Sequence, residues 1–418
     1  MTHQFTEYSP VEYLKIDIAS NYGKWKDKDL EKMNFEDRIA WFNEQEKEGN
    51  LVSLIKSADE APLYFAGLQA YRDMLDGKPI GYPTSMDACS SGLQILAVLA
   101  NCEKSAKRCG IINTGQREDA YTSLFVDMKE EANFVISARR EDLKQAIMTS
   151  LYGSMAEPRK LFGEGSPALK LFYKIMETKI PGAWSLNLAL KSLWQPWATE
   201  HEWVMPDGFE VSMTVEETMI NVVQFFGESV EIYSKQAKGT PTGLSLSPNI
   251  VHSVDGMIVR EMVRRCSYDT RQVRQVEDVC NIAMKRRDRR PSTKGQGRAK
   301  DKELRMLWER YLASGFLSTR VLDLIDENNI SMVSAHIVMN KIKDLPLRSF
   351  PVLCVHDCFR AHPNYMNDLR WQYNQIMSEL AASNILGDIA TQITGRKQVF
   401  KKVGNISETI KEANYALS

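Results

Sequence analysis

Residues 87–94 read Asp-Ala-Cys-Ser-Ser-Gly-Leu-Gln and place one carboxylate before a turn of small residues. Small side chains around Asp87 leave room for metal ions and phosphates, so this stretch is a candidate site. A plain helix cap is the more ordinary explanation of an aspartate before a serine-rich turn. The apolar residues that follow recur at helical spacing and predict a helix from Ser91 to Lys107: Leu93, Leu96, Ala97 and Ala100.

The composition is that of a globular protein without a strong overall charge. Of 418 residues, 43% are hydrophobic and 26% are charged, and the formal net charge is −1. At roughly 100–200 residues per domain, this length allows two or three domains or one large composite fold. No apolar run reaches the ~18 residues of a transmembrane helix, and Met1–Pro10 does not have the pattern of a signal peptide. Seven cysteines without zinc-ribbon spacing predict neither a disulfide scaffold nor a metal–thiolate site.

A second candidate stretch, Arg140–Gly153, predicts a helix from about Glu141 through Leu151 that stops at Gly153. Arg140 and Lys144 fall on one helical stripe roughly 6 Å apart along the axis, and Tyr152 lies about 12 Å beyond Lys144. These spacings are about those from phosphate to phosphate and from phosphate to base in a nucleoside triphosphate. Taken alone, an amphipathic helix with a solvated cationic edge is the simpler interpretation.

A third candidate stretch, Phe350–Phe359, is a short apolar run that contains His356-Asp357. Its β-rich composition predicts a buried strand that leads into a turn. A carboxylate at the tip of a strand is a rigid metal ligand, although an aspartate in a turn also needs no functional explanation.

A basic run extends from Lys285 to Lys302 and holds two acids, Asp288 and Asp301. Its glycines and proline predict an exposed loop, which is either a solvated linker or an arm that contacts phosphates. The cations are Lys285, Arg286, Arg287, Arg289, Arg290, Lys294, Arg298, Lys300 and Lys302.

Together, the three candidate stretches resemble motifs A, B and C of the single-subunit, bacteriophage-type DNA-dependent RNA polymerases in order and internal spacing. The matching residues are Asp87, Gly92 and Gln94 in motif A, Arg140, Lys144, Tyr152 and Gly153 in motif B, and His356-Asp357 in motif C. Trp203–Phe209 is similar to the family's WVTPDGF, Ser247–Gly256 to its APNFVHSQDG, and Tyr13–Ile16 to the start of its palm. Tyr121 falls 34 residues after Asp87, where the family also has a tyrosine. The resemblance covers nearly the whole chain.

The resemblance implies a helix-rich α+β fold, the palm and fingers of a right-hand polymerase, in which the thumb and the N-terminal domain are lacking. Residues 1–112 are expected to form the start of the palm with motif A, and residues 113–250 the fingers with motif B. Residues 251–418 are expected to return to the palm with motif C and to include a basic insertion at about 260–345.

The implied reaction is attack of a primer 3′-hydroxyl on the α-phosphate of a ribonucleoside triphosphate, with release of pyrophosphate. Two Mg²⁺ ions are expected on Asp87, Asp357 and the Ala88 carbonyl. Lys144 is expected to neutralise the triphosphate, and Arg140 to hold its terminal phosphate. Tyr121 is assigned to substrate binding by its position.

Two departures from the family A DNA polymerases, at Gly92 and Cys358, favour RNA over DNA as the product. Family A DNA polymerases place a glutamate, which blocks a ribose 2′-hydroxyl, where this chain has Gly92. They also continue motif C with a glutamate, where this chain has Cys358. In the RNA polymerases, the residue that matches Tyr152 helps to select ribonucleotides, and the one that matches His252 lies near the new base pair.

The family's usual chain is about twice as long, so the missing parts are expected from a partner. The sequence resembles the large subunit of a split enzyme, as in the heterodimeric RNA polymerase II of N-four-type podoviruses. A smaller subunit then supplies the N-terminal and thumb parts, a single-stranded-DNA-binding protein can bring the enzyme to its DNA template, and an apolar docking surface is expected. The expected location is the cytoplasm of an infected bacterial host, without a membrane partner.

Two segments depart from the family pattern. The segment between Phe209 and Ser247, where a promoter-reading hairpin usually lies, is shorter, so specific promoter recognition is not predicted. His252 and His356 are 104 residues apart, which leaves room for the basic insertion. Besides the run at 285–302, the cations expected there to hold template or a partner are Arg260, Arg264, Arg265, Arg271 and Arg274.

Two alternative functions stay open. One is a relative of the family A DNA polymerases, against which Gly92 and Cys358 argue. The other is a catalytically silent subunit that binds nucleic acid while its partner performs the chemistry.

Overall fold

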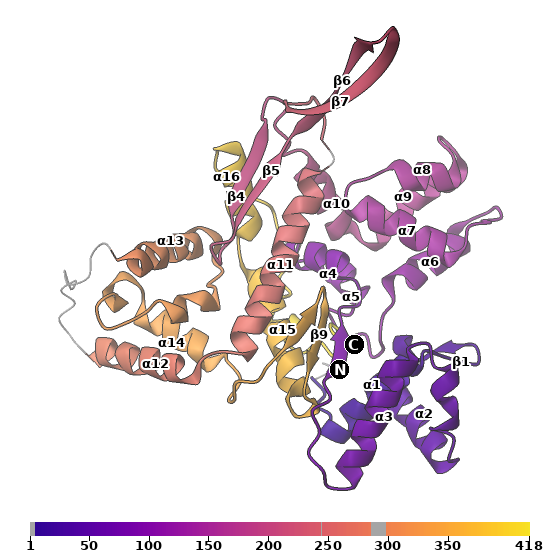
Figure 1. The fold of residues 1–418 in the computed structure, drawn as a ribbon, viewed down its shortest axis with the longest axis vertical. Coiled ribbons are helices and arrows are strands. Elements are labelled where there is room, and N and C mark those ends of the chain that lie inside the picture. Colours follow the sequence, from indigo (N-terminus) through magenta and orange to yellow (C-terminus); the bar gives the residue numbers. More distant parts are fainter. Residues whose placement is uncertain (1–4, 244, 286–297) are drawn as a thin grey trace.

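The computed structural model describes residues 5–243, 245–285 and 298–418. Within these ranges the chain is helix-rich and α+β, and its strands form small antiparallel sheets. Figure 1 shows N-terminal helices at one end, a second helical lobe at the side and a long hairpin that projects from the body. No helix in these ranges is both long enough and apolar enough to cross a bilayer. The expected nucleic-acid contacts Arg286, Arg287, Arg289 and Arg290 lie outside the described residues.

A three-stranded sheet joins two distant parts of the chain. Its order is β3 (Thr84–Asp87), β9 (Cys358–Ala361) and β8 (Leu353–Val355), and both pairs are antiparallel. Asp87 pairs with Cys358, and Val355 also pairs with Cys358, so His356-Asp357 forms the tight turn between β8 and β9. The register therefore places Asp357 beside the end of β3.

The prediction of one buried strand over Phe350–Phe359 was wrong in two respects. The segment contains two strands, and β8 is the edge of the sheet with Leu353 and Val355 each 58% exposed. His356 has φ 54°, a left-handed conformation that is uncommon for a residue with a side chain and that reverses the chain here. Apolar composition does not reveal whether a partner strand or solvent covers a strand.

The centre of the protein is a helical core behind this sheet. Helix α4 (Ser91–Leu99) is buried from Gly92 to Leu99 and packs against α11 (Leu246–Cys266) and α15 (Met366–Ala382). The helix predicted over Ser91–Lys107 is broken, because Asn101 adopts φ 51° and α5 starts only at Glu103. The remaining elements near this core are α5 (Glu103–Lys107), η5 (Pro363–Tyr365), α16 (Ile385–Thr394) and α17 (Ser407–Ile410).

The motif B helix lies in a helical layer that adjoins this core. Helix α7 (Arg140–Leu151) begins and ends close to the predicted limits, and Gly153 with φ 90° follows it. Its buried side chains include Leu143 and Ile147, which join the central core. The neighbouring helices are α6 (Ala120–Glu131), α8 (Ala156–Phe162), α9 (Pro167–Lys179) and α10 (Pro181–Lys191).

The N-terminal helices form a separate apolar core and support β3. Asp17, almost fully buried on the first helix, accepts hydrogen bonds from the Ser85 amide (2.8 Å), the Ser85 hydroxyl (2.8 Å) and the Tyr82 hydroxyl (2.6 Å). It therefore fixes the strand that ends at Asp87. The elements are α1 (Pro10–Tyr22), β1 (Lys24–Trp25), β2 (Lys28–Asp29), η1 (Leu30–Lys32), α2 (Phe35–Lys47), η2 (Ser53–Ser57) and α3 (Ala61–Leu75).

The region of the expected basic insertion contains a helical lobe with its own apolar core. Three cations expected there to hold nucleic acid or a partner are used inside the protein instead. Arg260 and Arg264 bind the buried Asp207 at 2.5 and 2.9 Å, and Arg265 is buried. The elements of the lobe are α12 (Thr270–Lys285), α13 (Ala299–Ser314), η3 (Thr319–Asp323), η4 (Ile330–Met332) and α14 (Ala335–Lys343).

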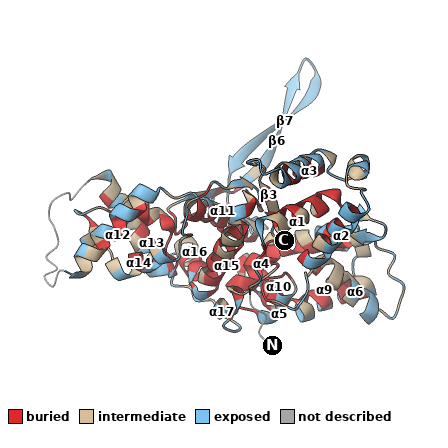
Figure 2. Cartoon of the chain, turned by 90° about the horizontal axis from the view of Figure 1, so that it is seen from below, coloured by how far each residue is buried: buried red, intermediate tan, exposed pale blue. Residues whose placement is uncertain are grey.

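The segment between Phe209 and Ser247 forms a long hairpin despite its short length. Strands β4 (Glu200–Val204) and β5 (Glu210–Thr214) pair with each other beside the core. Strands β6 (Glu216–Phe225) and β7 (Glu228–Ala237) follow and pair along their whole length. Figures 1 and 2 show this second hairpin extending into solvent, with its residues exposed.

A buried ion network joins α11, α14 and α15. Arg265 binds Glu379 through two nitrogens at 2.9 and 2.7 Å, and Lys341 binds the same carboxylate at 2.6 Å. Arg265 also contacts the buried Glu261 at 3.3 Å. Removing one partner of such a group leaves charges buried without compensation.

The variant Glu379→Ala is therefore expected to lower the free energy of unfolding by about 3–5 kcal/mol, measured by chemical denaturation.

Burial raises the pKa of Glu379, but Arg265 and Lys341 outweigh it and hold the pKa at about 2. The contribution of the charge is thus present above the ordinary pKa of 4.5 and is lost as the pH falls toward 2. Glu379→Gln should differ from the wild type at pH 7 and converge with it across that window. A difference independent of pH would contradict this account.

Candidate functional site

A cavity of about 580 Å³ lies where β3, the β8–β9 turn and helices α6 and α7 meet. Its walls also include residues of α1 and α3 and the last residue, Ser418. The structure thus brings Asp87 and Asp357, 270 positions apart in the sequence, into one cavity. The predicted site residues that line this cavity are Asp87, Ala88, Tyr121, Arg140, Lys144 and Asp357.

The two predicted carboxylate ligands, Asp87 and Asp357, come from neighbouring positions of the β3–β9–β8 sheet. The Ala88 amide donates to the Asp357 carbonyl at 3.2 Å, and Asp87 pairs with the residue after Asp357. Burial raises the pKa of Asp87, and the charge of Asp357 adds to this, whereas the Cys358 thiol and Arg360 oppose it. Two adjacent carboxylates whose charges repel favour a cation between them.

The donor atoms at this site suit a Mg²⁺ ion whose remaining coordination positions are filled by substrate and water. Among the described residues, no group of three or more His, Cys, Asp and Glu side chains could hold a metal ion. Mg²⁺ is commonly held by one or two carboxylates together with phosphate oxygens and water. Asp87 and Asp357, with the Ala88 carbonyl next to them in sequence, fit this type of site rather than an all-protein metal cage.

The two cations of α7 are held in place by the N-terminal turn of α6. Arg140 donates through Nε to the Thr122 hydroxyl at 2.6 Å and through Nη2 to the Asp119 carboxylate. Asp119 also accepts from the amides of Tyr121 (3.0 Å) and Thr122 (3.1 Å). Burial raises the pKa of Asp119, but the bonds from Thr122 and the charge of Arg140 outweigh it and hold the pKa below its ordinary value. Asp119 is therefore a charged acceptor that orients Arg140.

Tyr121 links this turn to Lys144 and to motif A. The Lys144 ammonium lies 5.5 Å from the centre of the Tyr121 ring, within reach of a cation–π interaction. The Tyr121 hydroxyl shares a hydrogen bond of 2.8 Å with the hydroxyl of Ser90. Arg140 and Lys144 thus both take their positions from α6.

Tyr152, Gly92 and His252 form a second contact between the motifs. The ring of Tyr152 stacks on the imidazole of His252, with centroids 4.9 Å apart and planes 13° apart. A Cβ atom on Gly92 would lie 2.7 Å from the Tyr152 hydroxyl. Burial raises the pKa of Tyr152 to about 12, with smaller contributions from nearby acids, so the hydroxyl stays protonated. The space that Gly92 leaves open is occupied by this hydroxyl.

Sequence reasoning missed four residues at the site. Asp119 and Arg117 line the cavity, and no pattern in their neighbourhood indicated them. Ser418 donates its amide to the Asp87 carbonyl at 2.9 Å. Asp255 lies near Asp357, and burial together with that charge raises its pKa to about 6 against the effect of His356. Of these, Asp255 had a signal, since it falls inside the stretch 247–256.

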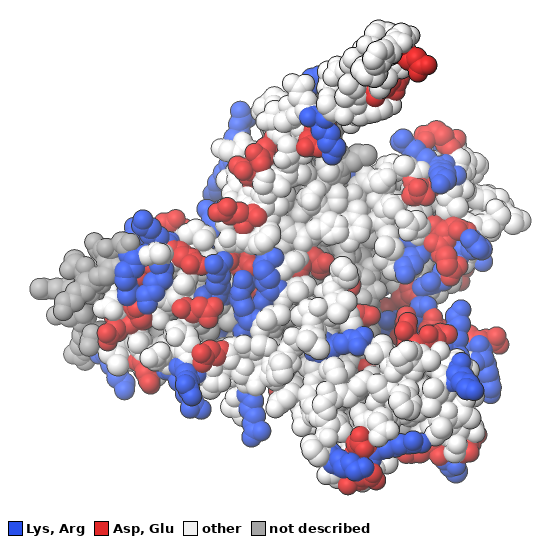
Figure 3. Space-filling view, viewed as in Figure 1, with Lys and Arg blue, Asp and Glu red and all other residues white. Residues whose placement is uncertain are grey.

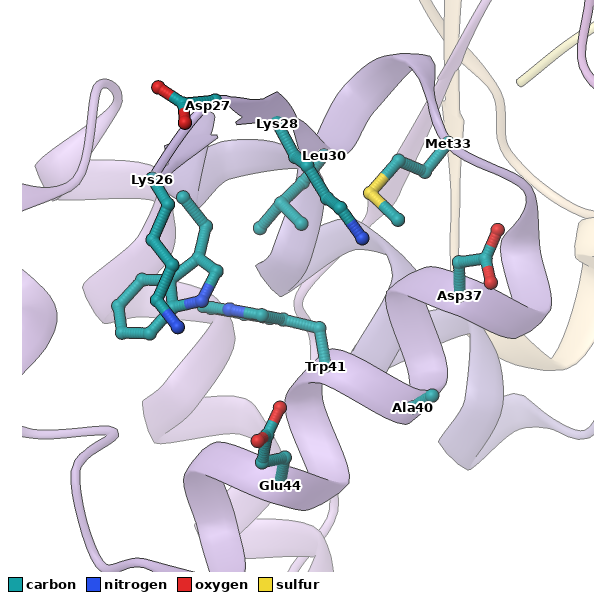
Figure 4. Close-up of a pocket in the computed structure, with 10 residues that line it drawn as sticks. Lys26, Asp27, Lys28, Leu30, Met33, Asp37, Ala40, Trp41 and Glu44 are labelled. Atoms are coloured by element: carbon teal, nitrogen blue, oxygen red, sulfur yellow. The ribbon is translucent and has the colours of Figure 1, made fainter.

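A second cavity, of about 490 Å³, lies in the N-terminal helices and contains none of the predicted site residues. Figure 4 shows Lys26 and Lys28 of the β1–β2 hairpin reaching toward α2, which contributes Asp37, Trp41 and Glu44. The Trp41 indole nitrogen is buried without a hydrogen-bond partner among the described residues. The Trp41 ring packs edge-on with the Trp25 ring, at a centroid distance of 6.0 Å. Aromatic packing therefore explains why the Trp41 side chain is buried.

No protein-family model matches the chain, and no curated protein is detectably similar to it. Function is therefore inferred from the residues of the site and their geometry.

The contact between Gly92 and Tyr152 can be tested by a double-mutant cycle on the free energy of unfolding. Gly92→Ala is expected to cost about 1–3 kcal/mol in the wild-type chain, because the new methyl group overlaps the Tyr152 hydroxyl. In the Tyr152→Ala background the same change should be neutral or stabilise by up to about 1 kcal/mol, because alanine favours a helix over glycine. Equal costs in both backgrounds would show that Tyr152 does not occupy that space.

Proposed function

We propose that this chain is the catalytic subunit of a DNA-dependent RNA polymerase that adds ribonucleotides to an RNA 3′ end on a DNA template. The observation that supports this best is the shared cavity of Asp87, Asp357, Arg140 and Lys144. Two carboxylates and two cations in one cavity are the groups that a metal-assisted phosphoryl transfer needs. The β3–β9–β8 sheet would serve as the palm and α6–α10 as the fingers.

Each residue has a role in this proposal. Asp87 and Asp357 bind Mg²⁺, which when bound lowers the charge barrier to attack on the α-phosphate. Lys144 neutralises the triphosphate and donates a proton to the leaving pyrophosphate, and Arg140 binds the terminal phosphate. The Tyr152–His252 stack offers an aromatic surface for the incoming base pair.

Selection of ribose is proposed to act through Tyr152. Since Gly92 lacks a side chain, the Tyr152 hydroxyl can lie against α4 with its proton retained. A protonated hydroxyl can donate a hydrogen bond to a ribose 2′-oxygen, which deoxyribose lacks. A glutamate at residue 92 would fill the space for the 2′-hydroxyl and would also displace Tyr152. Gly92 therefore supports RNA synthesis in two ways: it leaves that space open, and it lets Tyr152 stay in place.

The proposal includes a partner protein that supplies the thumb and N-terminal parts, with DNA template and RNA product in the assembled enzyme. Exposed apolar side chains near the site are compatible with this partner. Leu353 and Val355, beside the turn that carries Asp357, are each 58% exposed. A single-stranded-DNA-binding protein that delivers template is a further proposed partner.

Primer extension tests the proposed activity directly. An RNA primer on single-stranded DNA is offered ribo- or deoxyribonucleotides with Mg²⁺, using the chain alone and the chain co-expressed with its partner. Ribonucleotide addition is expected, and Asp357→Ala or Asp87→Ala should reduce it by about 10²–10³-fold or more, as should chelation of Mg²⁺.

Asp27→Ala is the matched control, because Asp27 is an exposed acid at the second cavity. Retained activity in Asp357→Ala would exclude the two-metal assignment. No extension by folded, template-bound wild-type complex would favour a catalytically silent subunit, and a preference for deoxyribonucleotides would favour a DNA polymerase.

A pair of variants tests whether Asp119 orients Arg140 or only adds a negative charge near it. Asp119→Asn keeps the cap of α6 but removes the charge that orients Arg140, so the KM for ribonucleotides should rise about tenfold or more with a smaller change in kcat. Glu141→Gln is the control, because Glu141 also faces Arg140 but only at 3.9 Å and largely exposed. Similar KM values for the two variants would contradict a specific role of Asp119.

A further inference from the structure

The β6–β7 hairpin has no covering within the described protein. Every residue of its two strands except Glu217 is exposed. Figures 1 and 2 show the hairpin standing away from the helices in two orthogonal directions. A two-stranded hairpin in water is marginal without packing on a further element, and both of its outer edges carry unpaired backbone groups.

The hairpin nevertheless has an apolar face. Because the strands pair Val223 with Val230 and Asn221 with Ile232, residues of opposite parity on the two strands share a side. The exposed fractions of the large apolar residues on this side run from 38% to 63%. Its large apolar residues are Met219, Val223, Phe225, Val230 and Ile232. The opposite side carries Ile220, Val222 and Tyr233, and Phe226 at the tip is 92% exposed.

The charges of the hairpin argue against nucleic acid as its ligand. Between Thr218 and Ser234 there is no lysine or arginine, and the charged residues are Glu228 and Glu231. The lysines at the base, Lys235 and Lys238, are paired with Glu216 at 2.9 Å and Glu217 at 2.6 Å. Figure 3 shows the outer part of the hairpin without basic atoms and with acidic atoms near its tip. Phosphates would meet only repulsion there.

The same charges argue against a second copy of this chain. On the apolar face, the acids are Glu217 at the base and Glu228 near the tip. Packed tip to tip, two such faces place Glu228 against Glu228, which is unfavourable in a partly buried contact, and packed tip to base they offer Glu228 a carboxylate that Lys238 already binds. A different protein with basic residues around an apolar surface has the matching charge.

The size of the hairpin indicates how such a partner would bind. Ten residues per strand give a length of ~34 Å, and two strands with their side chains give a width of ~10 Å. One face then offers ~340 Å², below the ~800 Å² per partner of a stable interface. Burial of both faces approaches that area, so the partner must enclose the hairpin rather than cover one side.

We propose that the β6–β7 hairpin docks into an apolar groove of another protein, and that lysine or arginine residues of that groove bind Glu228 and Glu231. This inference does not depend on the polymerase assignment, since it uses only the exposure, pairing and charge of the hairpin.

In-cell photo-cross-linking tests the occupant. The full chain carries a benzophenone amino acid at Val230 in its native host, and the control carries it at Leu312, an apolar residue 69% exposed on α13. An adduct with one protein of different sequence, formed from Val230 and not from Leu312, is the expected result. Adducts with nucleic acid, lipid or a second copy of the chain, or no adduct at all, would overturn the proposal.

The identified protein is then purified and its affinity for the chain is measured by calorimetry. Val223→Thr with Phe225→Thr should weaken binding at least tenfold, because threonine preserves strand propensity but removes the apolar contact. Glu228→Lys with Glu231→Lys should weaken it at least tenfold and reverse the wild-type loss of affinity with added salt. Leu312→Thr should leave the affinity unchanged. Unchanged affinity in both hairpin variants, with circular dichroism like that of the wild type, would overturn the proposal.

Discussion

The pairing of β3 with β9 is the contact on which the candidate site depends. It joins residues 84–87 to residues 358–361 in an antiparallel register, so that Asp87 ends beside the turn that carries Asp357. A shift of β3 by one residue in this register would turn the Asp87 side chain to the opposite face of the sheet, away from Asp357. Asp17 resists such a shift, because its buried carboxylate holds the Ser85 amide and hydroxyl. A residue of the N-terminal helices therefore helps to set the distance between the two carboxylates.

The cationic side of the cavity is arranged by a similar principle. Long cationic side chains lose rotamer freedom when they bind a ligand. Contacts that order them before the ligand binds reduce this loss of entropy. Asp119 and Thr122 fix the guanidinium of Arg140, while the Tyr121 ring fixes Lys144. One turn at the start of α6 thus prepares two groups on α7 for an anionic ligand. The opposed carboxylates and cations leave the cavity polar but nearly balanced in charge.

Position in the fold separates structural cations from available ones. Arg260 and Arg264 share Asp207, and Arg265 lies in the network around Glu379. These arginines join the central helix α11 to neighbouring elements through ion pairs, and Arg265 is buried. The β6–β7 hairpin shows the reverse for apolar residues. Their composition is that of a protein core, yet they are exposed to solvent.

Sequence alone determined the local features of this protein. The limits of α7, the glycine after it and the helix-rich composition follow from periodicity and turn chemistry, which act over a few residues. The motif spacing also predicted six of the residues that line the cavity. Asp119, the edge position of β8, the break at Asn101 and the pairing of Arg260 with Asp207 were decided only by the tertiary structure. Each depends on a partner tens to hundreds of residues away or on exposure to solvent, and no local pattern encodes either one.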